Sequence, residues 1–372
     1  MRAICPQATL MLAGDVMTGR GIDQILAHPG DPTLFESHVR SALDYVALAE
    51  RAHGPIPRRV PFDYIWGDGL SEIARHRPDL TFINLETAIT ARGSPAPKGI
   101  NYRMHPGNVG VLTAAGISAV SLANNHVLDW GRDGFNDTLD ALRAAGIGAA
   151  GGGCDLDAAS GPLEIAGQGP GRRLIFGIGC RDSGIPSDWA AKPARPGIYL
   201  LSTLSRAEAA RVAGSVRARK RSDDIVIASI HWGGNWGFEV PAAQRTFAHA
   251  LIDEGMVDVV HGHSSHHPKA IEIYRGKLIL YGCGDLINDY EGIVGDARFR
   301  SDLVLMYFAS VSHADGTLQS LEMVPFRVHR FRLQRASRQE ADWLAVTLRR
   351  DAGIVGAGIV VTPEATLRLE RT

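Results

Sequence analysis

The chain has 372 residues, of which 45% are hydrophobic and 21% charged, with a formal net charge of -1 and a pI near 6.9. This composition is typical of a folded globular protein, and it excludes a disordered chain and a strongly basic nucleic-acid-binding domain. The four cysteines include no CxxC pair, which argues against a disulfide framework and a thiolate zinc knuckle.

The N-terminal stretch MRAICPQATLMLAGDVM is too short and too polar for a signal peptide, because Gln7 and Asp15 interrupt its apolar run. No stretch of the sequence reaches the roughly 18 apolar residues that a membrane span needs. We therefore expect a cytoplasmic protein with no membrane insertion and no nucleic-acid partner.

Short apolar runs recur along the chain, and each ends in a cluster of polar residues. Such β-rich runs, buried on both faces, are typical of parallel or mixed sheets covered by helices. Residues 135–146 and 241–255 have helical patterns, the second with Pro at its start and Gly at its end. This alternation predicts an α/β fold. The apolar runs are ATLMLAGD, DLTFINLE, ISAVSLANNH, RLIFGIGC, DIVIASIHW, VDVVHGH and KLILYGCGD.

Four further segments complete the prediction. Residues 58–69 resemble a surface insertion, and the Gly-rich residues 160–173 indicate a turn between two halves of a sandwich. After about Ser310 the pattern becomes antiparallel, with ADGT as a hairpin turn. Residues 337–350 are predicted to form an amphipathic helix.

The side chains at the ends of the apolar runs carry the functional signal, because ligands bind outside the carboxyl ends of strands in open α/β sheets. A single strand-end Asp or Asn is more often a turn former or a helix cap. Carboxylates, amides and imidazoles at the ends of five of the seven runs instead favour a divalent metal site. The candidates are Asp15, Glu86, Asn125, His126, His231, His263 and His266.

Six motifs resemble the CapA family of bacterial capsule and poly-γ-glutamate synthesis proteins, within the calcineurin-like metallophosphoesterase superfamily. They lie in the family's order between about Leu10 and Phe308. The resemblance implies a four-layer α/β/β/α sandwich of two mixed β-sheets. Residues 8–310 would form the CapA-like domain, and residues 311–372 would add strands and a helix to the same domain. The motifs are GDVMTGR, NLETAIT, LANNHVLDWG, IHWGGNWG, GHSSHHPKAIE and GKLILYGCGDLIND.

The resemblance also implies roles for the candidate residues. His126 would act as a general acid or orient the substrate. Ligating imidazoles also need hydrogen-bond acceptors behind them, for which Asp129 and Asp133 are the candidates, with a capping or solvated role as the alternative for both. The implied metal ligands are Asp15 on the first strand, Glu86 as bridging carboxylate, the amide of Asn125, and His231, His263 and His266. The neighbouring His261 and His267 are expected to have no role.

Departures from the superfamily pattern leave the number of ions open. Met17 stands where the superfamily has a histidine, and Glu86 replaces the usual bridging aspartate. We therefore expect one or two divalent ions, Mn, Fe or Zn. Asp285 in YGCGDLIND is either a compensating ligand or a strand-end turn residue, and we favour the turn.

Two arginines are candidates for binding a substrate anion, because a guanidinium captures phosphate or carboxylate bidentately. They are Arg20 and Arg103, and the alternative for both is a solvated surface position. Trp232 and Trp236 could wall a pocket beside His231, although buried packing is the favoured interpretation.

These expectations predict a metal-dependent hydrolase that attacks a phosphoester or an amide, including a γ-glutamyl amide, with a metal-activated water. Its substrate would be a small anion or a polyglutamate-like chain. The alternatives are a non-catalytic accessory protein in poly-γ-glutamate or capsule biosynthesis, and a binding module whose metal is structural.

Overall fold

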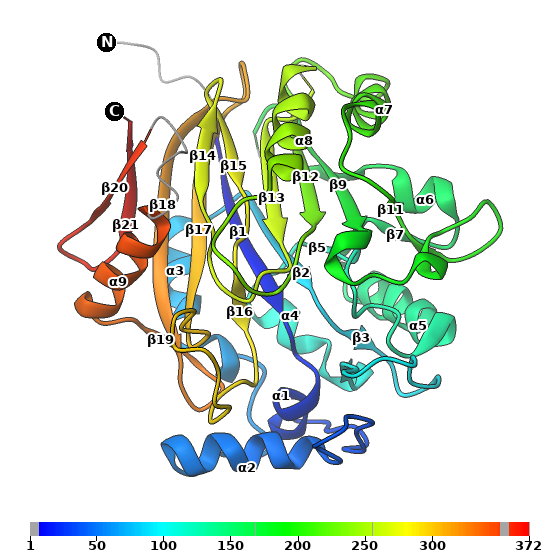
Figure 1. The fold of residues 1–372 in the computed structure, drawn as a ribbon, viewed down its shortest axis with the longest axis vertical. Helices are drawn as coiled ribbons and strands as arrows, with labels where there is room; N and C mark the ends of the chain where they lie inside the picture. Colours follow the sequence, from blue (N-terminus) through cyan, green and yellow to red (C-terminus); the bar gives the residue numbers. More distant parts are fainter. Residues whose placement is uncertain (1–6, 168, 255, 350–356, 372) are drawn as a thin grey trace.

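Two mixed β-sheets lie face to face with helices outside them (Figure 1). The computed structural model describes residues 7–167, 169–254, 256–349 and 357–371. The first sheet has the order β20 (Ala357–Val361), β21 (Leu367–Arg371), β18 (Leu318–Val328), β17 (Leu303–Ser312), β1 (Gln7–Val16), β2 (Leu80–Leu85), β5 (Ala119–Ser121) and β6 (Gly148–Ala150), with β16 (Asp285–Ile287) beside β1 and β19 (Leu333–Arg335) beside β18. The second has the order β11 (Leu200–Leu201), β9 (Arg172–Cys180), β12 (Ile225–His231), β13 (Val259–His263), β15 (Lys277–Leu280) and β14 (Ile271–Tyr274), with β8 (Leu163–Ala166) beside β9.

Strand alternation divides the apolar side chains into three layers, as a four-layer sandwich requires. In β1, Leu12 belongs to the core between the sheets, whereas Met11 packs with the helices that cover the first sheet. In β12, Ile227 faces the first sheet and Ala228 faces the helices of the opposite side. The predicted α/β/β/α sandwich of two mixed sheets is confirmed.

The helices cover the outer faces of both sheets. The three helices predicted from sequence are confirmed as α5, α8 and α9, with starts that differ by one to four residues; Gly255 and Arg350 lie outside the described residues. No helix within the described ranges has both the length and the apolar composition to cross a bilayer. The helices are α1 (Arg20–Ile25), α2 (Ala42–His53), α3 (Gly69–His76), α4 (Gly110–Ala114), α5 (Gly131–Ala144), α6 (Leu156–Ser160), α7 (Arg206–Arg217), α8 (Ala242–Asp253) and α9 (Arg338–Arg349).

Two predictions about connecting segments are wrong in part. Residues 58–69 are no surface insertion, because Trp66 is fully buried and its indole N–H donates to the carbonyl of Val111. Residues 160–173 do separate the strands of the two sheets, but they contain β8, which pairs antiparallel with β9.

The C-terminal part of the chain follows the predicted pattern. β17 and β18 form an antiparallel hairpin around the ADGT turn, and α9 follows them. Because β17 also pairs with β1, these strands extend the sheet that carries the first candidate ligand. Two short pairs lie outside the main sheets: β3 (Ala88–Ile89) with β4 (Arg103–Met104), and β7 (Gly152–Gly153) with β10 (Gly197–Ile198).

Candidate metal centre

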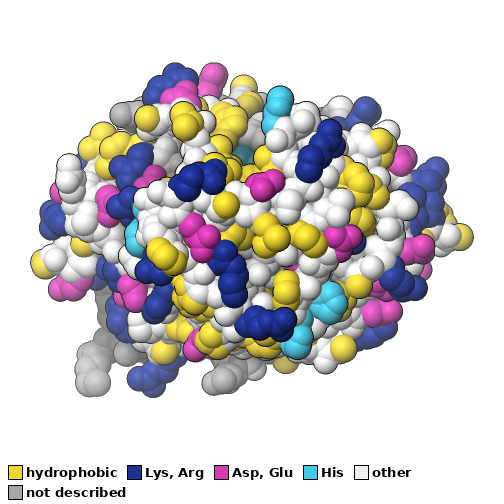
Figure 2. Space-filling model, turned by 90° about the horizontal axis from the view of Figure 1, so that it is seen from below, with side chains coloured by type: hydrophobic (Ala, Val, Ile, Leu, Met, Phe, Trp, Pro, Cys, Tyr) yellow, Lys and Arg dark blue, Asp and Glu magenta, His cyan; other side chains and the backbone are white. Residues whose placement is uncertain are grey.

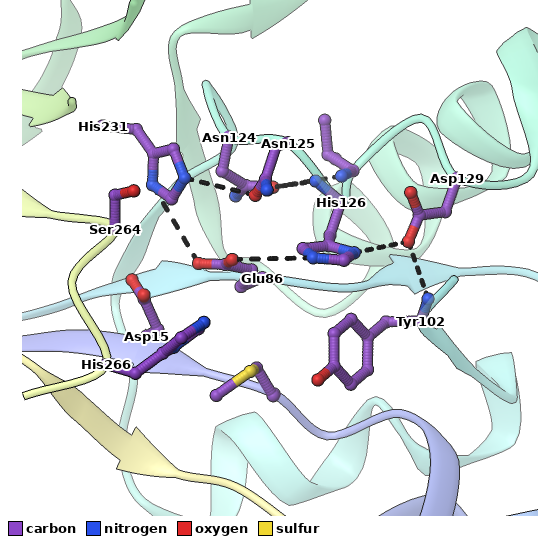
Figure 3. A network of polar contacts seen from close by, with 12 residues as sticks. Asp15, Glu86, Tyr102, Asn124, Asn125, His126, Asp129, His231, Ser264 and His266 are labelled. Carbon is purple, nitrogen blue, oxygen red and sulfur yellow. Dashed lines mark hydrogen bonds and ion pairs between the residues drawn. The ribbon is translucent and has the colours of Figure 1, made fainter. Parts of the chain in front are cut away.

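The candidate side chains meet where the carboxyl ends of strands from both sheets converge (Figure 3). The parallel register places Asp15 of β1 beside Asp285 of β16, and His231 of β12 beside His263 of β13. Parallel strands end at the same edge of a sheet, so residues far apart in sequence become neighbours there.

A break in the regular pairing of β1 turns Asp15 toward the site. The register shifts between Ala13 and Asp15, whereas strict alternation would place Asp15 on the helix-facing side with Ala13. Gly14 is required at this break, because a Cβ there would lie 1.8 Å from the carbonyl oxygen of Gly284.

Two groups of three buried side chains have the spacing of a metal site. In each group, one ligand atom from each residue lies within 4.8 Å of the others. Asp15 belongs to both groups, so the residue shared between the two positions is Asp15, whereas the sequence predicted Glu86 as the bridge. The groups are Asp15, His231 and His263, and Asp15, His266 and Asp285.

A chain of hydrogen bonds determines which nitrogen of His263 faces the site. His261 Nε2 lies 2.9 Å from the carbonyl oxygen of Ala13, which only accepts, so this nitrogen carries the proton. Burial lowers the pKa of His261 to about 4, so its Nδ1 is unprotonated and accepts from Ser229 Oγ at 3.1 Å. Ser229 Oγ in turn accepts from His263 Nε2 at 2.9 Å. His263 therefore presents an unprotonated Nδ1 to the site.

His231 presents its Nδ1 in the same way. Its Nε2 lies 3.2 Å from Asn125 Oδ1, an acceptor, and burial lowers the pKa of both His231 and His263 well below the usual value. The Nδ1 atoms of His231 and His263 are 2.8 Å apart. Two neutral imidazoles thus point lone pairs at each other, an arrangement that a cation between them would stabilise.

Among the described residues, neither Asp15 nor Glu86 forms an ion pair with a lysine or an arginine. Asp15 is fully buried, and its Oδ2 receives no hydrogen bond from the described residues. Burial, followed by the charge of Asp285, raises the pKa of Asp15 to about 7. Burial and the charge of Asp15 raise the pKa of Glu86 well above its usual range. The donor set and the unpaired Asp15 oxygen fit a divalent cation.

Metal affinity is expected to rise with pH up to about 7. In the metal-free protein, the raised pKa of Asp15 contributes to the free energy of unfolding. This contribution is fully present below pH 3.8, the pKa of aspartate in the unfolded chain, and it is lost as the pH rises to about 7. Below pH 7 a cation must displace this proton, so the apparent affinity should fall about tenfold per pH unit for each proton released. Calorimetric titration of chelator-treated protein with Mn²⁺ measures this, and an affinity independent of pH would contradict it.

His126 lies beside the candidate metal groups, in a polar network that Glu86 connects to His231 (Figure 3). Its Nδ1 is 2.6 Å from Asp129 Oδ2, and Lys98 Nζ is 2.8 Å from Asp129 Oδ1. Its Nε2 is 3.9 Å from Glu86 Oε1. Burial lowers the pKa of His126 to about 4, with Asp129 opposing the shift. The ring therefore donates Nδ1–H to Asp129 and exposes an unprotonated Nε2.

Asp285 belongs to the second candidate metal group and is the first residue of β16, so the preference for a turn role is wrong. The side chain is buried, and its Oδ1 lies 2.8 Å from His266 Nδ1. Asn288 donates to the other carboxylate oxygen at 2.9 Å. Burial lowers the pKa of His266, but Asp285 and Asp15 outweigh burial and the net shift is upward.

The remaining sequence-predicted residues occupy different surroundings. Asn125 lies next to the first metal group, with its amide oxygen 3.2 Å from His231 Nε2. The amide of Asn84, which the sequence analysis did not single out, donates to both Asp15 and Glu86, at 2.7 and 2.8 Å. Arg103 stacks on Trp130, with 3.7 Å from its guanidinium carbon to the ring centroid.

Arg20 is close to the site, but its charge is already matched. It is 3% exposed, with Nε and Nη2 3.1 and 2.5 Å from the carboxylate of Asp289 and Nη1 3.0 Å from Glu36 Oε1. Its guanidinium carbon also lies 3.8 Å from the ring centroid of Tyr45. These contacts favour a structural ion-pair network over capture of a substrate anion, because no side of the guanidinium is left without a partner.

Arg20→Met is expected to destabilise the protein by ~3–5 kcal/mol, because it leaves Asp289 and Glu36 buried without a counter-charge. Urea unfolding measures this loss. Arg143→Met, which removes an exposed ion pair with Asp140 on the surface of α5, serves as the control and should cost less than ~1 kcal/mol. A stable Arg20→Met protein that had lost only substrate affinity would restore the anion-binding interpretation.

An aromatic pocket with a volume of about 350 Å³ adjoins the candidate metal centre. His126 and His266 form part of its wall, so the pocket and the metal groups are continuous. Trp236 also lines it and is 51% exposed, so the expectation of buried packing is wrong for Trp236; Trp232, at 2% exposed, is buried as expected. The lining residues are Arg20, Tyr45, Ile100, Tyr102, His126, Asn235, Trp236, His266, Tyr290, Ile293, Gly295 and Ser301.

Sequence reasoning missed Ser229 and His261, which determine the orientation of His263. A signal was present, because Ser229 lies two positions before His231 and His261 two before His263. Alternate residues of a strand share a face, so both point into the space between the sheets. Nothing in the local pattern indicated that the two would hydrogen-bond to each other.

The fold and this rim of carboxylates and imidazoles define an α/β/β/α sandwich protein with a candidate metal centre. The chain belongs to the family described as "Bacterial capsule synthesis protein PGA_cap", which it matches over residues 9–290. The resemblance to CapA proteins is thereby confirmed.

Two curated relatives and one solved structure illustrate the similarity. The chain is 49% identical over 364 residues to a "Probable polyglutamine synthesis accessory protein" of Mycobacterium tuberculosis (strain ATCC 25618 / H37Rv), covering 97% of this chain and 95% of the relative. It is 26% identical over 319 residues to the "PGA biosynthesis protein CapA" of Bacillus subtilis (strain 168), covering 85% and 70%. A structure described as a novel phosphatase from Mycoplasma pneumoniae has a TM-score of 0.47 and 11% identity, covering 95% and 100%.

Proposed function

We propose that this protein is a metal-dependent hydrolase that cleaves a phosphoester or an amide, including a γ-glutamyl amide. The observation that carries the proposal is the pair of unprotonated Nδ1 atoms of His231 and His263, 2.8 Å apart beside the unpaired oxygen of Asp15. This arrangement is unfavourable without a cation and favourable with one. One or two ions, Mn, Fe or Zn, suit the mixed nitrogen and oxygen ligands.

Different side chains of the protein would bind the cation and position its ligands. Asp15, His231 and His263 would hold the first ion, and Asp15, His266 and Asp285 a second, with Glu86 adding charge beside both. A bound ion supplies Lewis-acid polarisation and an activated water. Asn84 donates to Asp15 and Glu86 and keeps their carboxylates in place.

His126 is proposed to accept a proton or a hydrogen bond at Nε2. Its Nδ1–H is held by Asp129, and its lowered pKa keeps the ring neutral in the resting state. A neutral ring with a free Nε2 suits a general base better than the general acid that the sequence predicted. After taking up that proton, the same nitrogen can return it to the leaving group.

A non-catalytic role in capsule or poly-γ-glutamate assembly is the second candidate. It is favoured by the similarity to the relative from Mycobacterium tuberculosis, which is described as a probable accessory protein and aligns with 97% of this chain. In that role the metal centre would bind a polyglutamate-like chain or another small anion without cleaving it.

The test begins with protein stripped by a chelator and reloaded separately with Mn²⁺, Fe²⁺ and Zn²⁺. Metal content is measured first, and the loaded protein is then assayed against phosphomonoesters, phosphodiesters and γ-glutamyl amides. Metal-dependent turnover of one class supports the hydrolase. Bound metal without turnover of any class supports the accessory role, and failure to bind any of the three metals contradicts both proposals.

A further inference from the structure

The aromatic pocket beside the metal centre has walls that suit a particular class of substrate group. The rings of Tyr102 and Tyr290 lie 4.5 Å from His126 and 5.5 Å from His266, centroid to centroid. Their hydroxyl oxygens are 3.2 Å apart, so together the two tyrosines join the two histidines across the pocket. Trp236 faces His266 from another side, with the ring centroids 5.5 Å apart.

Three apolar side chains that line the pocket are exposed to solvent. Ile100, Trp236 and Ile293 are 42%, 51% and 44% exposed, and all three line the pocket, although Trp236 also packs against Phe299 with 5.2 Å between the ring centroids. Burying such side chains against a ligand removes apolar surface from water. They are therefore available to hold an apolar part of a substrate.

The described residues of the pocket offer no unpaired positive charge to a carboxylated substrate group. Among the described residues that line it, the one permanently charged side chain is Arg20, and two carboxylates already face its guanidinium. Lys98, behind His126, is engaged by Asp129. A second carboxylate of a substrate would find no unmatched cation here, and leaving it buried would be costly.

The described surface around the candidate metal centre also lacks a basic region that would bind a polyanion. Figure 2 views the molecule from the side of α1 and α2, the side toward which β1 points in Figure 1. Lys and Arg side chains are scattered there among Asp, Glu and hydrophobic ones, and the described residues of this face form no continuous basic surface. A long polyanion would therefore gain little on this face away from the metal centre.

We infer that the aromatic pocket binds an uncharged ring or compact hydrocarbon group of the substrate, next to the metal-bound phosphoryl or acyl group. The inference rests on the proposed function, because it takes the metal centre as the anchor for the polar end. A volume of about 350 Å³ lies at the small end of ligand pockets and suits one ring system.

The test compares three phosphonates, which are not hydrolysed, as ligands of the Mn²⁺-loaded protein. They are methylphosphonate, benzylphosphonate and 3-phosphonopropanoate, and calorimetry measures their affinities. Benzylphosphonate is expected to bind about tenfold or more tighter than methylphosphonate. The carboxylated probe is expected to bind no tighter than methylphosphonate.

Variants assign the preference to the pocket. Trp236→Ala and Ile100→Ala, at positions exposed enough for the fold to tolerate the change, should each bring the benzyl-to-methyl affinity ratio down toward one. Val346→Ala, at an equally exposed apolar residue of α9 that does not line the pocket, should keep the wild-type ratio.

Each outcome separates this inference from the proposed function. Tighter binding of the carboxylated probe, a wild-type ratio near one, no binding of any phosphonate, or an unchanged ratio in both pocket variants overturns the pocket assignment. A benzyl preference in a protein that hydrolyses none of the three substrate classes leaves the pocket in place and refutes the hydrolase. Turnover without a benzyl preference supports the hydrolase and refutes the pocket assignment.

Discussion

His263→Ala and His263→Gln proteins are expected to bind metal more weakly than wild type by more than the ~10–100-fold that loss of an outer partner costs. His263 supplies one of the two facing lone pairs, and removing it leaves His231 and Asp15 to hold the ion. Metal content after dialysis, and titration of the metal-free variants, measure the loss. The glutamine variant keeps most of the side-chain volume, so it separates metal loss from a cavity in a fully buried position.

Variants of the hydrogen-bond chain sharpen this prediction. Ser229→Ala and His261→Phe leave the ligands intact but remove the contacts that hold the proton on Nε2 of His263, so each should weaken metal binding by ~10–100-fold. His249→Ala changes a histidine that bonds Glu272 and lies outside both metal groups, and it should retain wild-type metal content. Wild-type metal affinity in both His263 variants would remove this residue from the centre.

His126→Ala is expected to lower kcat by ~10²–10⁴-fold while metal content stays near that of wild type. His126 faces the pocket and lies outside both metal groups, so its loss removes proton transfer rather than a ligand. Steady-state kinetics on the substrate class identified by the screen, together with metal analysis of the same sample, measure both quantities.

A matched pair of variants tests how His126 works. Asp129→Asn changes the partner of Nδ1 and should lower kcat and shift the pH profile, because the ring is no longer held by a carboxylate. His105→Ala, in the turn that precedes α4, should leave the kinetics unchanged. If turnover by His126→Ala matched wild type, the residue would have no part in proton transfer.

The local sequence pattern predicts most of the side chains that meet at the candidate metal centre. Asp15, His231 and His263 each end an apolar run, and the strands that those runs form do bring them together. Their role as metal ligands remains a prediction. Asp285 also ends such a run, but a single Asp after two glycines could not be told from a turn residue until β16 was placed beside β1.

Arg20 illustrates why the rest could not be predicted. The sequence made Arg20 a candidate for binding a substrate anion, with a solvated surface position as the alternative, yet its main partner, Asp289, lies 269 positions away in sequence. Neither residue carries a local sign of the other. Whether a buried guanidinium is free or neutralised depends on that long-range contact, and the assignment of Arg20 changed for this reason.

The sequence by itself determined the alternation of strands and helices, the two-sided burial of the strands, and the kinds of ligand at their ends. Hydrophobic periodicity records which faces are buried, and it is read from residues that are near one another in the chain. Only the tertiary structure decided which nitrogen of each imidazole faces the site, which charges are already matched, and what lines the pocket. Those properties depend on atoms such as His261 Nε2 and the carbonyl oxygen of Ala13, which are 248 positions apart and meet only once the two sheets have packed.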